Sequence, residues 1–225
     1  MISVIIPTLN AAPVIGPTLG SLSPAILDPV LSEVIISDGG STDDIEDIAE
    51  ATGAKFVTGK ASRGRQLAAG ADVARGEWLL FLHADTRLSE DWVEVALRHI
   101  SGGAQKAGWF RLAFDASGGA ARFVAAWANL RSRWLGLPYG DQALLIHRSL
   151  YRNAGGFPDQ PLMEDVALAR ALGRRRLVGL GAVATTSAEK YLRQGWVWRG
   201  MRNLTYLARY FLGVSPETLA AAYRR

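Results

Sequence analysis

Three short groups of polar residues follow apolar runs in the first part of this 225-residue chain. Residues 7–10 (PTLN) follow ISVII, residues 38–40 (DGG) follow SEVIIS, and residues 83–85 (HAD) follow EWLLFL. Near-continuous apolar runs are typical of strands that are buried on both faces of a parallel sheet. Ligands of such sheets bind beyond the carboxyl ends of the strands, so we expect the three groups to converge on one binding rim.

Asp85 is the candidate metal ligand. A carboxylate that follows a buried run has left the core, and its hard oxygens suit Mg²⁺ or Mn²⁺, which could bridge to a diphosphate. The alternative is that Asp85 caps a helix beginning near residues 89–91 (SED). The two other polar groups expected at the same rim favour the metal site.

Asp38 is a candidate for recognising a nucleoside, because its carboxylate can accept hydrogen bonds from a base or a ribose. The two glycines after it permit a close approach of the backbone. The alternative is an ordinary turn, in which Ser41 or Thr42 caps the next helix. The segment DGGSTD is neither a GxGxxG fingerprint nor a loop with a Walker lysine, which argues against NAD and P-loop sites.

Two further pairs of charged residues stand at predicted helix starts. Arg63 and Arg65 would combine their guanidinium groups with free backbone N–H groups into an anion site, or remain a solvated surface pair. Glu164 and Asp165 could supply a general base that activates an acceptor hydroxyl. Their alternative role is to complement the helix dipole.

Several other chemistries are excluded by residue types and spacing. The chain has no cysteine, which excludes disulfides and thiolate metal sites. Its three histidines, His83, His99 and His147, show no HExxH spacing, which argues against a catalytic zinc site. No GxSxG segment is present, which argues against a serine hydrolase of that type.

The order of the predicted elements indicates an α/β fold. Strands are expected over 2–7, 32–40, 54–59, 77–85 and 107–115, and helices over 43–52, 64–76, 121–136 and 163–174. Residues 137–158 mix a loop, a short strand and a small helix. Alternation of strands and helices predicts right-handed crossovers and an open, mainly parallel sheet with helices on both faces.

The composition bounds the class of protein without naming a ligand. With 49% hydrophobic and 20% charged residues, the chain suits one compact domain over 1–225. A net charge of +4 allows an anionic ligand, a membrane surface or a nucleic acid. The first residues lack a signal-peptide pattern and no apolar run approaches a membrane span, so a cytoplasmic location is expected.

Four segments together resemble the inverting glycosyltransferases of family 2, which have the GT-A fold. These segments, SVIIPTLN, DGGSTD, GRQLAAGADVARGEWLLFLHADT and GGFPDQPLMEDVALARAL, stand in the order and at the spacing of that family. The resemblance covers about Ile2 to Leu172. The segment LRSRWLGLPYGDQ and the tail from TTSAEKYLRQGW onward are similar to a narrower bacterial subgroup of glycosyltransferases.

The resemblance implies a nucleotide-sugar donor, expected to be UDP-linked, and a nucleotide-binding half over 1–88. Asp38 would contact the base, Arg65 the nucleotide, and Asp85 would match the last acid of the DxD metal motif. The usual first acid of that motif is here His83, which could ligate the metal or contact the ribose or a phosphate. The expected nucleotide pocket is completed by Pro7, Thr8 and Asn10.

The resemblance also implies an acceptor and catalytic half over 89–189. Asp165 matches the acid that serves as general base, with Glu164 beside it, and the attack would invert the anomeric carbon in one displacement. Asp141 and Gln142 would border the donor sugar or the acceptor. No histidine follows Glu164, so the late third metal ligand of some GT-A enzymes is missing.

The predicted helical tail, residues 190–225, alternates aromatic residues with arginines. One interpretation is an interfacial helix over 190–213 on an anionic bilayer, which would suit a lipid-linked acceptor. A second is that Arg193 and Arg199 reach the donor phosphates. The third is a helix that packs on its own domain or on a dimer partner.

Two rival functions differ in their expected ligands. A nucleotidyltransferase would release pyrophosphate, but the glycine-rich basic loop expected after the first strand is missing. A non-enzymatic module that binds membrane or nucleic acid through its basic tail would bind no sugar donor, and its affinity would collapse with salt. We expect a glycosyltransferase with no nucleic-acid partner.

Overall fold

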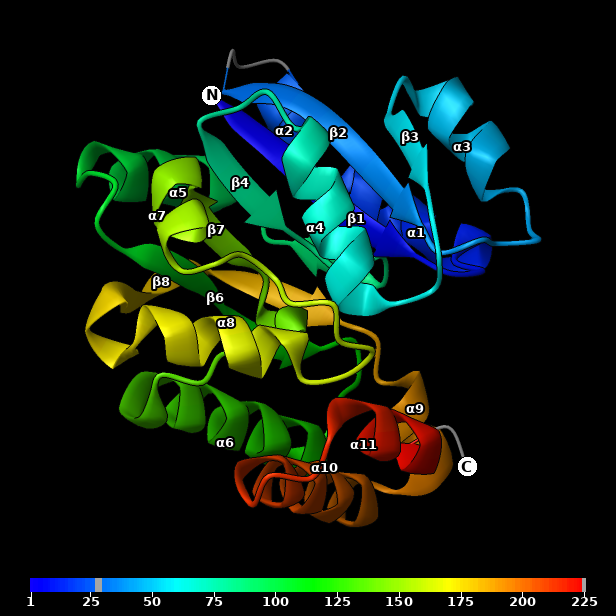
Figure 1. Cartoon of the computed structure of the whole chain (residues 1–225), viewed down its shortest axis with the longest axis vertical. Helices are drawn as coiled ribbons and strands as arrows, with labels where there is room; N and C mark the ends of the chain where they lie inside the picture. Colours follow the sequence, from blue (N-terminus) through cyan, green and yellow to red (C-terminus); the bar gives the residue numbers. More distant parts are fainter. Residues whose placement is uncertain (27–29, 224–225) are drawn as a thin grey trace.

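The computed structural model describes residues 1–26 and 30–223 and has one eight-stranded sheet among them (Figure 1). Its first half contains the predicted parallel strands in the order β3-β2-β1-β4. They are β1 (Ile2–Thr8), β2 (Leu31–Asp38), β3 (Lys55–Thr58) and β4 (Trp78–Phe81). Their carboxyl ends therefore lie on one edge, as the sequence predicts.

The second half of the sheet is mixed in direction. It continues from β4 through β7 (Leu144–His147), β6 (Ala107–Phe114), β8 (Leu177–Thr186) and β5 (Thr86–Leu88). The β4·β7, β6·β7 and β5·β8 pairs are antiparallel, whereas β6·β8 is parallel. Four of the seven pairings among the described residues are parallel, so the expected mainly parallel sheet is confirmed with an antiparallel component in this half.

The short strand β5 shows that the sheet curls back on itself. Residues 82–85 are all that separates β4 from β5, although these strands take the fourth and the eighth place in the sheet. Thr86 pairs with Thr186 at the far edge. The loop that carries His83 and Asp85 thus joins the middle of the sheet to its β5 edge.

Helices cover both faces of the sheet, as predicted. Those of the first half are α1 (Ala12–Gly20), α2 (Ser23–Ile26), α3 (Ile45–Thr52), α4 (Arg63–Val73) and α5 (Trp92–Ser101). Those of the second half are α6 (Gly119–Leu135), α7 (Arg148–Asn153), α8 (Glu164–Leu172), α9 (Glu189–Gln194), α10 (Trp196–Phe211) and α11 (Pro216–Tyr223). Two 3-10 turns, η1 (Gly140–Gln142) and η2 (Arg174–Arg176), complete the described elements.

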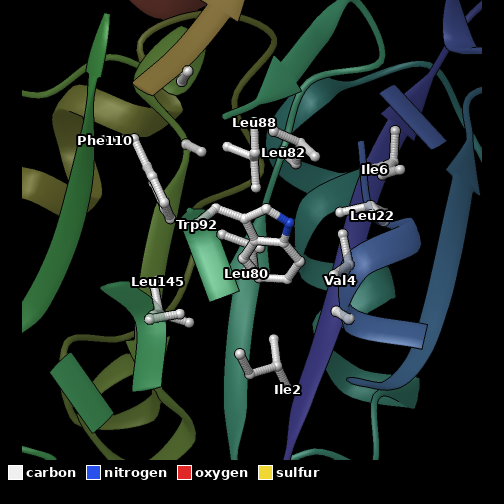
Figure 2. Packing of buried hydrophobic residues seen from close by; sticks show 14 of the residues in the cluster. Ile2, Val4, Ile6, Leu22, Leu80, Leu82, Leu88, Trp92, Phe110 and Leu145 are labelled. Atoms are coloured by element: carbon white, nitrogen blue, oxygen red, sulfur yellow. The ribbon is translucent and has the colours of Figure 1, made fainter. Parts of the chain in front are cut away.

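Strands β1 and β4 bury both faces because alternate side chains enter two different cores. Val4 and Ile6 of β1 point into one cluster, in which the fully buried indole of Trp92 lies among apolar residues of several strands (Figure 2). Ile5 points the other way and packs against Leu67 and Ala71 of α4. This two-sided burial explains the continuous apolar runs that made these strands visible in the sequence.

Some elements had no clear sequence signal. Helix α1 contains Pro13 in its first turn and Pro17 inside it, and β8 is interrupted by Gly179 and Gly181, which weakens both patterns. Helix α4 ends at Val73, before the predicted end at residue 76, because Ala74 is already extended. Within residues 1–26 and 30–223, no helix combines the length and the apolar character that crossing a bilayer requires.

Gly64 fixes the start of α4 against the loop that precedes α8. A Cβ atom at this position would lie 2.0 Å from the carbonyl oxygen of Pro158, and the Gly64 N–H donates to the Gln160 carbonyl at 3.1 Å. Only glycine permits this approach of two backbones. The contact brings Arg63 to the same region as Glu164, although the two are distant in sequence.

Candidate active site

Two adjoining cavities lie along the carboxyl edge of the first four strands. The larger one, of about 430 Å³, is lined by residues that follow β1 and β4, by the start of α4 and by α11. The smaller one, of about 160 Å³, lies between η1, α8, α9 and α10. Both are lined by Arg63, His83, Asp85, Leu162, Ser187, Lys190 and Tyr223. These residues therefore mark the place where contents of the two cavities would meet.

Pro7, Thr8 and Asn10 line the larger cavity, where the sequence predicts a nucleotide pocket. Asn10 has a left-handed backbone (φ 53°), and its side-chain oxygen accepts the Thr42 N–H at 2.9 Å. Its own N–H donates to the Ser41 hydroxyl at 2.8 Å. These bonds tie the segment after β1 to the segment after β2.

Asp38 lies behind this wall and is only 3% exposed. Its carboxylate accepts the Gly40 and Ser41 N–H groups at 2.7 Å each, together with the hydroxyls of Thr8 and Ser41. Burial alone would raise the pKa of Asp38, but the hydrogen bonds, led by that of Ser41, lower it. In this geometry the side chain organises the loop and has all its acceptor positions occupied.

The two arginines at the start of α4 point in different directions. Arg65 forms a two-point ion pair with Asp159, and among the described residues it is not part of the lining of either cavity. Arg63 lines both cavities, and its Nε lies 3.7 Å from Oε1 of Glu164. Of the two arginines that the sequence proposes for an anion site, Arg63 is thus the one that lines the cleft.

His83 and Asp85 stand at the junction of the cavities. His83 packs closely against η1, since a Cβ atom at Gly140 would lie 2.4 Å from His83 Nε2. Burial lowers the pKa of His83 to about 4, and the charge of Arg63 acts in the same direction, so the imidazole is neutral near pH 7. The Asp85 carboxylate makes one long contact, accepting the Thr86 hydroxyl at 3.4 Å. Its oxygens are therefore available to a ligand in the cleft.

The donor set fits a divalent ion that takes few ligands from the protein. Among the described residues, no group of three or more His, Asp or Glu side chains could enclose a metal. Asp85 presents a free carboxylate, and neutral His83 lies two residues before it. Mg²⁺ is commonly held by one or two carboxylates together with substrate phosphates and water, and this pattern matches the residues present.

Asp165 is held in the first turn of α8 and lines the smaller cavity. Its Oδ2 accepts the Gly140 N–H at 2.8 Å, and its Oδ1 accepts the Val166 N–H at 2.7 Å. Two backbone donors at the start of the helix fix the orientation of the carboxylate. Lone pairs remain on both oxygens, so the group can also accept a proton from a substrate hydroxyl.

Glu164 is almost completely buried beside Asp165. Burial, followed by the charge of Asp165, raises the pKa of Glu164 to about 7, against the opposing effect of Arg63. Its Oε2 has no hydrogen-bond partner among the described residues. Its ion-pair distance to Arg63 makes Glu164 a link between the start of α8 and the start of α4.

The two neighbouring candidates of η1 have different surroundings. Asp141 lines the smaller cavity, and burial raises its pKa to about 6, with Asp165 adding to the effect. Gln142 is fully buried; it accepts the Ser132 hydroxyl and donates to the Asn129 side chain at 3.1 Å. Gln142 therefore holds η1 to α6 instead of bordering a ligand, which corrects the sequence-based placement.

The arginines of the tail also separate. Arg193 is exposed on α9 and lies 3.6 Å from Glu189, outside the lining of both cavities. Arg199 is buried, lines the smaller cavity, and donates to Gln194 at 2.8 Å and to the Tyr223 hydroxyl. Of the two phosphate-binding candidates in the tail, only Arg199 is in the cleft.

Sequence reasoning missed four residues of the cleft junction, Leu162, Ser187, Lys190 and Tyr223. Lys190 lines both cavities and adds a second cation beside Arg63. Tyr223 lies between the cavities and is held by Arg199 and by Arg202, which donates to its carbonyl at 2.9 Å. A lone lysine in a helix with other charged residues is typical of a solvated surface, so the sequence carries no signal for the position of Lys190.

Solved structures with low sequence identity share this fold, which is that of the GT-A proteins. The chain is similar to residues 1–349 of S. aureus TarS in complex with UDP-GlcNAc, with a TM-score of 0.63 at 18% identity over 82% of this chain and 58% of that one. It is also similar to glucosyl-3-phosphoglycerate synthase from Mycobacterium tuberculosis in complex with Mn²⁺, UDP and glucosyl-3-phosphoglycerate. There the TM-score is 0.55 at 21% identity, over 83% of this chain and 70% of that one.

Curated relatives match over shorter stretches. A PGL/p-HBAD biosynthesis glycosyltransferase of Mycobacterium bovis is 38% identical over 97 residues, which are 40% of this chain and 37% of the relative. Glucosyl-3-phosphoglycerate synthase of Mycolicibacterium paratuberculosis is 33% identical over 93 residues, 37% of this chain and 28% of the relative. The matched part is thus well under half the length of either relative.

A family model gives the broadest match along the sequence. The model described as Glycosyl transferase family 2 matches residues 3–136, which include β1 to β6 and the loop with His83 and Asp85. This match covers more than half of the 225 residues and agrees with the fold of the solved structures. The chain therefore belongs to glycosyl transferase family 2.

Proposed function

We propose that this protein transfers a sugar from a UDP-sugar to an acceptor hydroxyl. The observation that carries the proposal is the meeting of two cavities at His83, Asp85 and Arg63, with Asp165 on the wall of the smaller one. A transferase needs this arrangement, because donor and acceptor must approach each other from two sides in a fixed geometry. The larger cavity would hold the nucleotide and the smaller one the acceptor.

The choice of a uridine nucleotide is supported by the relatives. The TarS structure is described with UDP-GlcNAc and the synthase from M. tuberculosis with Mn²⁺ and UDP. In this chain Pro7, Thr8 and Asn10 would border the nucleotide, and Asp38 would act through the loop that it holds together. The sugar would lie toward the junction of the cavities.

Cationic side chains would stabilise the diphosphate leaving group. Arg63 and Lys190 line both cavities, and Arg199 lies on the side of the smaller one. Asp85, with His83 beside it, would hold Mg²⁺ or Mn²⁺ against the diphosphate; a bound divalent ion supplies positive charge where negative charge develops. Electrostatic stabilisation of this kind makes a second carboxylate for protonating the leaving group unnecessary.

Asp165 would act as the general base. Its fixed carboxylate in the smaller cavity takes the proton of the acceptor hydroxyl as the oxygen attacks the anomeric carbon. The bond to the diphosphate oxygen breaks on the opposite face, so one displacement inverts the configuration. Asp141 would border the acceptor from η1.

The tail suggests both the kind of acceptor and the location of the protein in the cell. An acceptor carried by a lipid would reach the smaller cavity along residues 190–213, in contact with a membrane surface. The cytoplasmic location expected from the sequence, on the inner face of the membrane, stays a prediction.

Binding of the donor tests the function most directly. We expect UDP and at least one UDP-sugar to raise the melting temperature in the presence of Mn²⁺ more than other nucleotides do, because a ligand of the folded state stabilises it in proportion to its affinity. The stabilising UDP-sugar should then release UDP when a suitable acceptor is supplied. Release of pyrophosphate from a nucleoside triphosphate, or no stabilisation by any nucleotide sugar, would contradict the proposal.

The two arginines of α4 give a matched pair of variants for the same assay. Arg63→Ala should weaken UDP binding by about tenfold or more, since a charge-assisted contact to phosphate is worth roughly 1.5–3 kcal/mol. Arg65→Ala removes a surface ion pair with Asp159 and should have the smaller effect. Isothermal titration with UDP measures both. A larger loss in Arg65→Ala would favour Arg65 as the nucleotide contact, as the family resemblance implies.

A further inference from the structure

The charges of this chain are separated along its sequence. The segments 116–140, 166–188 and 190–216 hold 12 of its 25 Lys and Arg residues and none of its 21 Asp and Glu residues. They include α6, most of α8, η2, β8 and α10. The rest of the chain carries all the acidic residues, so a basic part and an acidic part are distinguishable although the net charge is only +4.

Helix α6 leaves an apolar stripe uncovered within this basic part. Its small residues Ala121, Ala125 and Ala128 face inward, and Phe123 on the other side is 73% exposed. The exposed residues follow helical spacing, three or four apart and then adjacent at the end. They are Phe123, Trp127, Leu130, Trp134 and Leu135.

Helix α10 has the same character and lies beside α6 at the end of the molecule opposite the N-terminus (Figure 1). Arg199, Asn203 and Tyr206 line the smaller cavity from one face of this helix. The other face is apolar and uncovered, with Trp198 66% exposed. Its exposed large residues are Val197, Trp198, Met201, Leu204 and Phe211.

Arginines stand at the ends of both stripes. A Cβ atom at Gly136, directly after α6, would lie 2.8 Å from Cα of Arg174, so the triple-arginine turn η2 abuts the end of α6. The guanidinium of Arg170 lies 5.1 Å from the ring centre of Phe211 at the end of α10. Exposed aromatic residues bordered by arginines, with no acidic residue in these segments, are the features of a surface that binds anionic lipid.

We propose that α6, α10 and η2 form a face that docks on an anionic lipid bilayer. The apolar stripes would enter the headgroup region while the arginines pair with lipid phosphates. Exposed apolar area on two neighbouring helices is otherwise unfavourable in water. This face extends the membrane contact proposed for residues 190–213 to a helix outside the tail, and its binding does not depend on the transfer reaction.

The docking face also gives a reason for the position of the acceptor cavity, and this step rests on the proposed function. Helix α10 would contact the bilayer with one face and line the smaller cavity with the other. An amphiphilic acceptor could then keep its apolar part in the bilayer while its hydroxyl reaches Asp165. The acceptor class inferred here is a lipid with a polar, hydroxyl-bearing headgroup.

Vesicle binding by the full chain tests the face. We expect the protein to sediment with vesicles of phosphatidylcholine containing about one-third phosphatidylglycerol, with an affinity at least about tenfold above that for pure phosphatidylcholine. Raising the salt from about 0.1 M to about 0.5 M should weaken the binding, because the contact of arginines with phosphates is screened. Equal binding to both vesicles, or no binding to either, overturns the proposal.

Two pairs of surface variants locate the contact. Phe123→Ser combined with Trp198→Ser should abolish most vesicle binding, whereas Leu97→Ser, at an exposed position of α5, should leave it unchanged. Arg133→Glu combined with Arg175→Glu should also abolish most vesicle binding. Its control is Arg75→Glu, near the amino ends of the strands, which should leave vesicle binding unchanged. Since all these residues are exposed, the variants should keep the melting temperature and the UDP affinity of the parent.

Two other results have a defined meaning. A dimer that the Phe123 and Trp198 substitutions dissociate, without vesicle binding by either form, would identify the face as a contact between copies of this chain and overturn the lipid assignment. Preference for nucleic acid over anionic vesicles would overturn it as well. The vesicle assay tests only the docking face, and UDP binding tests only the proposed function. A parent protein that binds UDP but no vesicles would therefore overturn the first proposal and leave the second standing.

Discussion

Replacing Asp165 by asparagine is expected to lower kcat by roughly 10²–10⁴-fold, the usual contribution of a positioned general base. Asparagine has nearly the same shape and can still accept one of the two backbone N–H groups that fix Asp165, but it cannot take a proton. Because the side chain lines only the smaller of the two cavities, the affinity for UDP should stay within about threefold. Single-turnover transfer and titration with UDP separate the two effects.

The control for this variant is Asp72→Asn, which changes an exposed carboxylate on α4. It should keep the parent rate. If Asp165→Asn turned over normally while Glu164→Gln lost activity, the base would be Glu164, whose pKa is raised to about 7 by burial and by Asp165. Normal turnover of both variants would exclude the start of α8 as the source of the base.

Replacing Asp85 by alanine is expected to have the second largest effect. The parent should lose activity in a chelator and regain it with Mn²⁺ or Mg²⁺, whereas Asp85→Ala should need at least about a hundredfold more metal to reach its lower maximum. The reason is that Asp85 offers the only largely uncommitted carboxylate at the junction of the two cavities, among the residues the structure describes. Binding of Mn²⁺ in the presence of UDP, followed by electron paramagnetic resonance, gives a readout that does not depend on turnover.

Glu90→Ala is the matched control, since Glu90 is an exposed carboxylate shortly after the same loop. It should bind Mn²⁺ and UDP like the parent. If a chelator left the rate of the parent unchanged and Asp85→Ala also turned over normally, a metal would have no part in the mechanism. In that case Arg63 and Lys190 would have to provide the positive charge at the diphosphate.

The rim of the sheet could be predicted because its signal is local. Strands β1 and β4 and the second half of β2 are buried on both faces, so each gives an apolar run, and the polar residues that end it must lie near one edge. The first turn of α8 was equally visible, because Glu164 and Asp165 precede a regular helical pattern. In both cases the chemistry depends on residues that are neighbours in sequence.

The choice between neighbouring residues could not be predicted. Arg63 and Arg65 are two positions apart on a helix, which turns about 100° per residue, so they must point about 200° apart. That spacing shows that both cannot enter the cleft, but it does not show which one does. The answer depends on Asp159 and on the contact of Gly64 with Pro158, which lie about 95 residues further along the chain.

Gln142 and Arg199 illustrate the same limit. Gln142 follows a glycine and an acid, like a loop residue of a site, but Ser132 and Asn129 of α6 hold it in the core. The tail sequence alternates aromatic residues with arginines, which left several interpretations open, and the structure places the buried Arg199 on the cleft side of α10 and Trp198 on the exposed side. Periodicity indicates that a helix has two faces, whereas tertiary packing decides which of them is covered.

The pairing of Thr86 with Thr186 has a consequence for how the site is assembled during folding. The strands β1 to β4 can pair soon after their residues leave the ribosome, since their contacts are comparatively local, but β5 has to wait for β8, a hundred positions later. The Ser187 N–H also donates to the Asp85 carbonyl at 3.2 Å, so the backbone of Asp85 is fixed only when β8 has docked. A nascent chain would therefore form the strand ends around Thr8 and Asn10 early, whereas the junction with Asp85, and with it the complete site, would form late.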